Sequence, residues 1–148
     1  MYLRGTARIA QASFTAGTTY NLLCCAAPAH QQVAVTGFGL YGTSNAAATP
    51  GLLEFATASS QGTSGTTVTP TSLVQAITTT FQSSWITQPS GAPGSIVPFE
   101  SREVNPQGGI SELWSQNDWY VIKDGGFFIV QWTPQFTGNY CAWMRIAE

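Results

Sequence analysis

The sequence predicts an all-β fold, and three of its features point that way. Residues that favour strands, such as Thr, Val, Ile and the aromatic types, are plentiful, whereas the helix formers Lys, Glu and Leu are scarce. Apolar and polar residues alternate over short stretches, which is the period of a half-buried strand. Turn residues separate these stretches at short intervals, a spacing typical of an antiparallel sandwich or a barrel.

The first half of the chain contains four expected strands. The stretch from Leu3 to Ile9 alternates so that Arg4 and Arg8 share one face. The next, Tyr20 to Ala26, is almost entirely apolar, which predicts a central strand covered on both faces. The third and fourth strands are expected at Val33 to Tyr41 and Leu52 to Ala58, with a loop from Thr43 to Gly51 between them.

The middle of the chain is rich in Ser, Thr and Gly. Ser59 to Pro70 predicts a mobile surface loop. We expect at most one short helix, over Thr71 to Ile77, because Pro70 stands near its start and proline is favoured in the first turn of a helix. The remainder is the most strand-like part, with strands expected at Ile96 to Val104, Leu113 to Trp114, Trp119 to Lys123, Phe127 to Trp132 and Tyr140 to Ile146.

The charge content predicts a subunit of an assembly. The chain has 148 residues, so we expect a single domain over 1–148. Only 8% of the residues are Asp, Glu, Lys or Arg, against about 25% in an ordinary domain. A folded monomer of this mass exposes on the order of 7,300 Å², or roughly 600 Å² for each charged side chain. A surface so poor in charge favours association with copies of itself or with other proteins.

Charge and hydropathy also argue against several classes of protein. The net charge of −2 provides no basic field to attract nucleic acid or anionic lipid. No apolar run reaches the 18 or more residues of a membrane span. The first residues alternate in character instead of placing a basic tip before an apolar block, so we expect no secretion signal and synthesis in a cytoplasm.

No motif in the chain predicts a cofactor or a metal. Gly37 to Gly42 satisfies G-x-G-x-x-G, but no helix is expected after it, so the glycines are interpreted as close-packing positions in a strand. His30 is the only histidine, and we expect it in a loop. The three cysteines argue against a disulfide framework because their number is odd, and they are expected in or near the core: Cys24, Cys25 and Cys141.

Paired carboxylates are the remaining route to catalysis. Glycosidases on β-sandwich frames use two carboxyl groups about 5–10 Å apart. Glu100 and Glu103 are expected on opposite faces of one strand, whereas Glu112 with Asp118, or Glu54 with another acid, has no sequence feature that places the two together. We therefore expect that the protein is not an enzyme.

Five tryptophans are many for this length. Two or three are expected to fill the core, and the rest are candidates for exposed anchors in an interface or for stacking on sugar rings. As interaction residues we select Trp85, Trp114 and Trp119, together with Arg4 and Arg8.

Several segments resemble small virion proteins of tailed bacteriophages. They are Ser13 to Tyr20, Ala27 to Val33 with Gly37 to Gly39, and Glu103 to Gly109, followed by the Gly125-Gly126 hairpin and an Ala-rich last strand. The type that these segments resemble is the capsid cement, or decoration, protein. The similarity does not extend over Ser59 to Thr87.

The resemblance implies a β-sandwich, often of the jelly-roll type, that trimerises on the outside of the capsid. The expected partner is the major capsid protein, and the expected location is the virion surface. We expect the face with Arg4 and Arg8 to contact the shell. The alternative is a carbohydrate- or receptor-binding module that uses exposed tryptophans.

Overall fold

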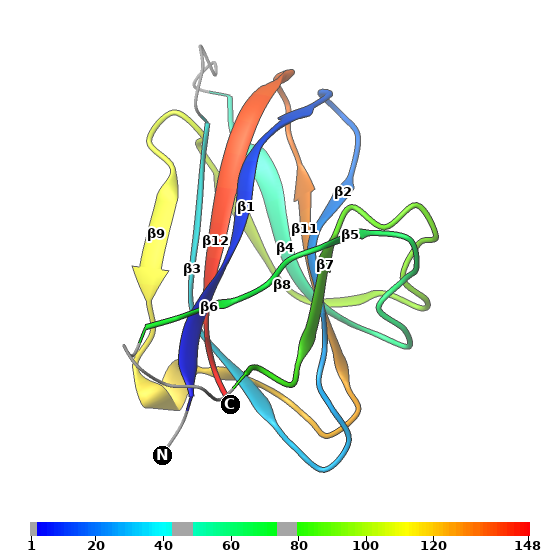
Figure 1. The fold of residues 1–148 in the computed structure, drawn as a ribbon. Coiled ribbons are helices and arrows are strands. Elements are labelled where there is room, and N and C mark those ends of the chain that lie inside the picture. The colour runs from blue at the N-terminus through cyan, green and yellow to red at the C-terminus, as the bar shows by residue number, and fades with distance from the viewer. Residues whose placement is uncertain (1–2, 43–48, 74–79) are drawn as a thin grey trace.

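In the computed structural model, two antiparallel sheets pack against each other (Figure 1). The structure describes residues 3–42, 49–73 and 80–148. The predicted antiparallel β-sandwich is confirmed, and the jelly-roll topology stays a prediction. The elements are β1 (Arg4–Phe14), β2 (Tyr20–Ala26), β3 (Val33–Gly42), β4 (Gly51–Ala58), β5 (Thr66–Thr67), β6 (Thr71–Ser72), β7 (Ser84–Thr87), β8 (Val97–Val104), β9 (Ile110–Leu113), the 3-10 turn η1 (Gln116–Asp118), β10 (Tyr120–Ile122), β11 (Phe127–Thr133) and β12 (Gly138–Ala147).

The two sheets differ in their edges. Sheet A has the strand order β10-β3-β12-β1-β6, and β9 also pairs with β3. Sheet B has the order β5-β7-β2-β11-β4-β8. The first and last described residues extend the pairing of β1 with β12, since Leu3 N donates to Glu148 O at 2.7 Å and Glu148 N donates to Leu3 O at 2.9 Å. β8 of sheet B and the strands β9 and β10 of sheet A lie on the same side of the sandwich, which we call the open side because no strand pairing among the described residues links the two sheets there.

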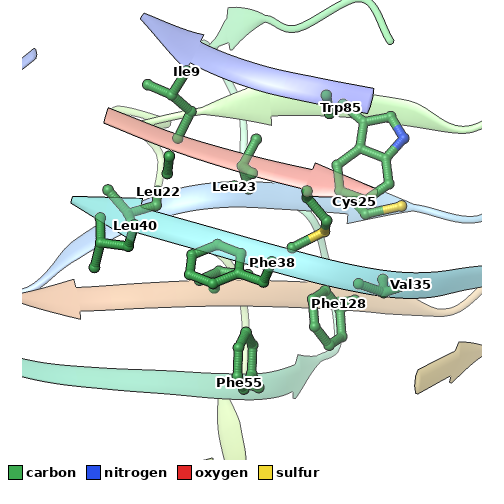
Figure 2. Packing of buried hydrophobic residues seen from close by; sticks show 14 of the residues in the cluster. Ile9, Leu22, Leu23, Cys25, Val35, Phe38, Leu40, Phe55, Trp85 and Phe128 are labelled. Carbon is green, nitrogen blue, oxygen red and sulfur yellow. The ribbon is translucent and has the colours of Figure 1, made fainter. Parts of the chain in front are cut away.

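The core lies between the sheets and is rich in aromatic side chains (Figure 2). Phe38 of sheet A meets Phe55 of sheet B edge to face, with ring centroids 5.4 Å apart. Phe128 packs on Phe55 at 6.0 Å. Burial of one such side chain stabilises the fold by about 1.5–3 kcal/mol, and edge-to-face pairs add specificity to the packing.

The prediction of a central second strand is confirmed. β2 lies between β7 and β11, and both of its faces are covered. Cys25 belongs to the main core, whereas Cys24 packs with Ala56 and Ile129 in a small second cluster on the other face of sheet B. Cys24 and Cys25 are thus buried as predicted, and Cys141 is half-buried.

The predictions for the middle of the chain are corrected only where β5 and β6 replace them, and the mobility of Ser59 to Pro70 stays a prediction. Thr66–Thr67 form β5, which extends sheet B, and the Gln61 side chain donates to the backbone oxygens of Cys24 at 2.6 Å and Ser84 at 2.7 Å, so the predicted loop is held against the sheet. The predicted helix begins instead as β6 at Thr71–Ser72, because threonine favours extended chain. The remainder of the predicted helix, residues 74–77, lies outside the described residues. So do residues 43–48, which make up most of the loop predicted from Thr43 to Gly51.

Candidate functional site

The outer face of sheet A combines arginines with apolar side chains. The strand register fixes which residues share it: Arg8 lies opposite Trp143, and Thr6 lies opposite Arg145. Arg4 and Arg8 are both exposed, so the prediction that they share one face is confirmed. We define the outer face of sheet A by Arg4, Arg8, Tyr41, Leu113, Val121, Cys141, Trp143 and Arg145.

Two glycines of β3 allow large side chains to lie flat on this face. A Cβ atom at Gly39 would stand 2.1 Å from Nε1 of Trp143, and one at Gly37 would stand 2.8 Å from a methyl group of Leu113. The G-x-G-x-x-G string lies within β3, and its glycines serve close approach, as predicted. Trp143 and Leu113 can therefore pack directly against the backbone of β3.

Much of the apolar surface on this face is open to solvent. Leu113 is 66% exposed, Val121 54% and Tyr41 40%. Large apolar residues in this state are ordinary when scattered singly, but here three of them share one sheet face. Aromatic residues and arginine are also the types enriched in protein interfaces.

The charges on the two broad faces have opposite signs. Of the five basic residues, Arg4, Arg8 and Arg145 lie on the outer face of sheet A, and no ion pair within the described ranges involves them. Glu54 and Glu103 point outward from β4 and β8 on sheet B, where Glu54 pairs in register with Ser101. The outer face of sheet A is therefore suited to a partner with exposed carboxylates.

The five tryptophans divide between the core and the surface. Trp85 is 1% exposed and Trp132 is fully buried, so two fill the core, as expected. The selection of Trp85 as an interaction residue is corrected, because its indole packs in the core and its Nε1 donates to Ser83 Oγ at 2.7 Å. Trp114 and Trp119 are half-buried at the open side of the sandwich.

An ion network joins the two sheets at that open side. Arg102 on β8 donates from Nε to Glu100 and from Nη1 to Glu112 on β9. Tyr120 on β10 donates its hydroxyl to Glu100, and Trp114 Nε1 donates to Glu112 Oε2 at 3.0 Å. Charge-assisted bonds of this kind hold their groups more firmly than neutral ones. The network thus fixes the position of both carboxylates.

Glu112 does not have the electrostatics of an acid catalyst. The hydrogen bond from Trp114 and the bonds from Arg102 hold the pKa of Glu112 below its ordinary value, although partial burial acts in the opposite direction. A general acid needs a raised pKa. Asp118 lines the same hollow of about 550 Å³ as Glu112, but its carboxylate accepts a bond from Ser115. The absence of catalysis stays a prediction.

Other chemical groups in the described part of the chain have simple local roles. His30 is exposed, and its backbone N–H and Nδ1 both face the carboxylate of Asp124 in a turn. Within residues 3–42, 49–73 and 80–148, no group of three or more His, Cys, Asp or Glu side chains is placed to hold a metal ion. The same residues include no helix with the length and hydrophobicity that a bilayer span requires.

Most of the outer face of sheet A was not predicted from the sequence. Arg4 and Arg8 were selected as interaction residues, but Arg145 and Trp143 were not, although β12 alternates as regularly as β1. That alternation was the available signal. Leu113 and Val121 had no comparable signal, because their exposure depends on two short strands that both pair with β3.

Comparison of the chain with known protein families, with characterised proteins and with solved structures finds no match. The assignment of a function therefore depends on the residues and their geometry.

Proposed function

We propose that this protein is a capsid decoration subunit of a tailed bacteriophage. In this proposal it binds the major capsid protein on the outside of the head through the outer face of sheet A. Its sandwich is of the jelly-roll type, and the working unit is a homotrimer. It acts by stabilising the shell mechanically and makes or breaks no covalent bond.

One observation carries the proposal: the outer face of sheet A groups three arginines, which have no carboxylate partner among the described residues, beside exposed apolar side chains. The rest of the surface supports it, since the molecule exposes 7512 Å² and has few charges to keep it apart from other proteins. Arginine and aromatic groups on a strand-built surface form the kind of patch that docks against another protein.

Trimer symmetry would make weak contacts sufficient. Once one subunit of a trimer engages a threefold point of the shell, the other two bind at a high effective concentration. Avidity can then exceed the affinity of one contact by about 10²–10⁴. This mechanism requires only buried area and matched charge, which the exposed apolar side chains and the arginines of the outer face of sheet A would supply on docking.

Co-sedimentation with empty shells tests the proposal. The shells are assembled from the major capsid protein encoded nearest to this gene. We expect the wild-type protein to sediment with them, and the variant with Arg4→Glu and Arg8→Glu to bind at least tenfold more weakly, because both changes place carboxylates on the docking face.

The matched control reverses a charge on the opposite sheet. Glu103→Lys changes an exposed residue of sheet B and should leave shell binding unchanged. Failure of the wild-type protein to sediment with shells, or equal binding by the double arginine variant, would count against the proposal.

The oligomeric state is tested separately by sedimentation velocity at micromolar concentration. We expect a trimer. A protein that is monomeric at every concentration would remove the multivalent part of the mechanism.

A further inference from the structure

The open side of the sandwich carries a second surface that the proposed function does not use. Two hollows adjoin there, of about 550 Å³ and about 460 Å³, and Trp119 and Tyr120 line both of them. Volumes of 300–1,000 Å³ are typical of sites for small ligands. The larger hollow is polar in character, lined by residues of β8, β9 and η1, and the smaller is mainly apolar.

The tryptophans of this site present carbon surfaces to solvent. Trp119 Nε1 donates to the backbone oxygen of Trp114 at 3.1 Å, and Trp114 Nε1 donates to Glu112 at 3.0 Å. Both indole N–H groups are thus used within the protein. The exposed part of each indole is therefore its carbon surface, which is suited to stacking against the C–H face of a sugar ring.

The aromatic groups are also held in fixed positions. Trp114 meets Tyr120 edge to face at 4.9 Å between ring centroids, and it meets Phe55 of the core at 5.9 Å. A site whose side chains are already ordered loses little entropy when a ligand binds.

The polar wall offers donors and acceptors side by side. Arg102 uses Nε and Nη1 in the ion network, and its Nη2 takes part in neither bond. Both bonds to Glu112 go to Oε2, which leaves Oε1 as an acceptor. The two side chains are 30% and 39% exposed. A pair of neighbouring hydroxyl groups, each able to donate and to accept, matches this arrangement.

The charge of the site selects against anions. Glu100, Glu112 and Asp118 outnumber Arg102 within the larger hollow, so a phosphate or an acidic sugar would be repelled. A simple cation is less well matched, because each carboxylate already accepts a bond from Arg102 or Ser115. The chemistry therefore favours a neutral, hydroxyl-rich ring.

We propose that the hollow between β8 and η1 binds a neutral saccharide, whose ring stacks on Trp119 and whose hydroxyl groups bond to Arg102 and Glu112. The larger hollow shares no residue with the outer face of sheet A, so a subunit bound to a shell would still present it, although Val121 of that face lines the smaller hollow. It would give the particle a weak affinity for glycans, multiplied by the number of subunits.

Titration calorimetry and tryptophan fluorescence with four neutral tetrasaccharides test the site: cellotetraose, maltotetraose, mannotetraose and chitotetraose. We expect at least one to bind with a millimolar or lower Kd. Trp119→Ala should weaken that binding at least tenfold, whereas Trp119→Phe, which keeps an aromatic face, should retain most of it. Trp143→Ala, on the outer face of sheet A, is the matched control and should bind as the wild type does.

Asp118→Ala provides a second variant in case Trp119→Ala does not fold, because Asp118 is an exposed residue of η1 that lines the larger hollow and keeps Oδ1 as an acceptor for a sugar hydroxyl, since Ser115 donates to Oδ2. We expect it to lower saccharide affinity several-fold with an unchanged thermal midpoint. No binding of any of the four saccharides at millimolar concentration would overturn the proposal, as would wild-type affinity in both Trp119→Ala and Asp118→Ala. Binding of choline in preference to every saccharide would also overturn it, by identifying a cation site.

Discussion

Arg102 of sheet B and Glu112 of sheet A form an ion pair across the open side of the sandwich, where no strand pairing links the two sheets. The Arg102 guanidinium also lies 5.9 Å above the ring of Phe55, at the boundary of the core. The Arg102 side chain therefore contacts the edge of the opposite sheet and the apolar core at the same time. Because both partners are partly exposed, the pair is screened by water, and its strength lies between a surface and a buried ion pair.

Removing either partner should destabilise the fold. We expect Arg102→Met and Glu112→Gln each to lower the free energy of unfolding by about 1–2 kcal/mol, because each removes charge-assisted hydrogen bonds from a partly buried network. A double-mutant cycle measured by urea denaturation should give a coupling of about 0.5–1 kcal/mol. The control Arg4→Met, on an exposed site, should change stability by less than about 0.5 kcal/mol. Strict additivity of the two changes would mean that the pair contributes nothing.

The stability conferred by Glu112 should depend on pH. Its pKa in the folded protein is lowered from the ordinary value of 4.5, so the folded state favours the ionised carboxylate. This contribution is complete above about pH 4.5 and is lost as the pH falls through the folded pKa. Between pH 6 and pH 3, denaturation should show a loss in the wild type that exceeds the loss in Glu112→Gln by a few tenths of a kcal/mol. Parallel pH profiles would show that Glu112 has no such role.

The two buried tryptophans should respond differently to the same substitution. Trp85 Nε1 donates to Ser83 Oγ at 2.7 Å, whereas Trp132 Nε1 is buried and has no hydrogen-bond partner in the part of the chain that the structure describes. Replacement by Phe creates a cavity at both sites, but only Trp85→Phe also breaks a hydrogen bond. We expect Trp85→Phe to cost about 1 kcal/mol more than Trp132→Phe in chemical denaturation. The reverse order would show that the packing difference outweighs the bond.

The parts of the fold and of the site that depend on local alternation could be predicted from the sequence, whereas the parts that depend on contacts between distant segments could not. Alternation is local, and it correctly gave the shared face of Arg4 and Arg8 and the strand at Tyr20–Ala26. The burial of Trp85 is not local, because it depends on where a four-residue strand in a Ser- and Thr-rich segment joins sheet B. The pair of Arg102 and Glu112 was missed for the same reason: these residues belong to different sheets, and no spacing rule connects them.

The three cysteines should differ in reactivity. Burial raises the pKa of Cys24 to about 12 and that of Cys25 well above its ordinary value. Only the thiolate reacts quickly with thiol reagents, so both should resist labelling in the folded protein. Cys141 is half-buried on the outer face of sheet A. Mass spectrometry after a short maleimide treatment should find one label on the native protein and three after denaturation. Rapid native labelling of Cys24 or Cys25 would contradict the packing of β2.

Cys141 therefore reports directly on the face that is proposed to dock. The decisive measurement is the rate of maleimide labelling at Cys141 in free protein and in protein bound to empty shells. If the outer face of sheet A contacts the shell, binding should slow this labelling at least tenfold, while Glu103→Cys on sheet B, as a reference thiol, labels at the same rate in both states. If Cys141 labels equally fast on the shell, or Glu103→Cys is protected in its place, the docking face has been assigned to the wrong sheet.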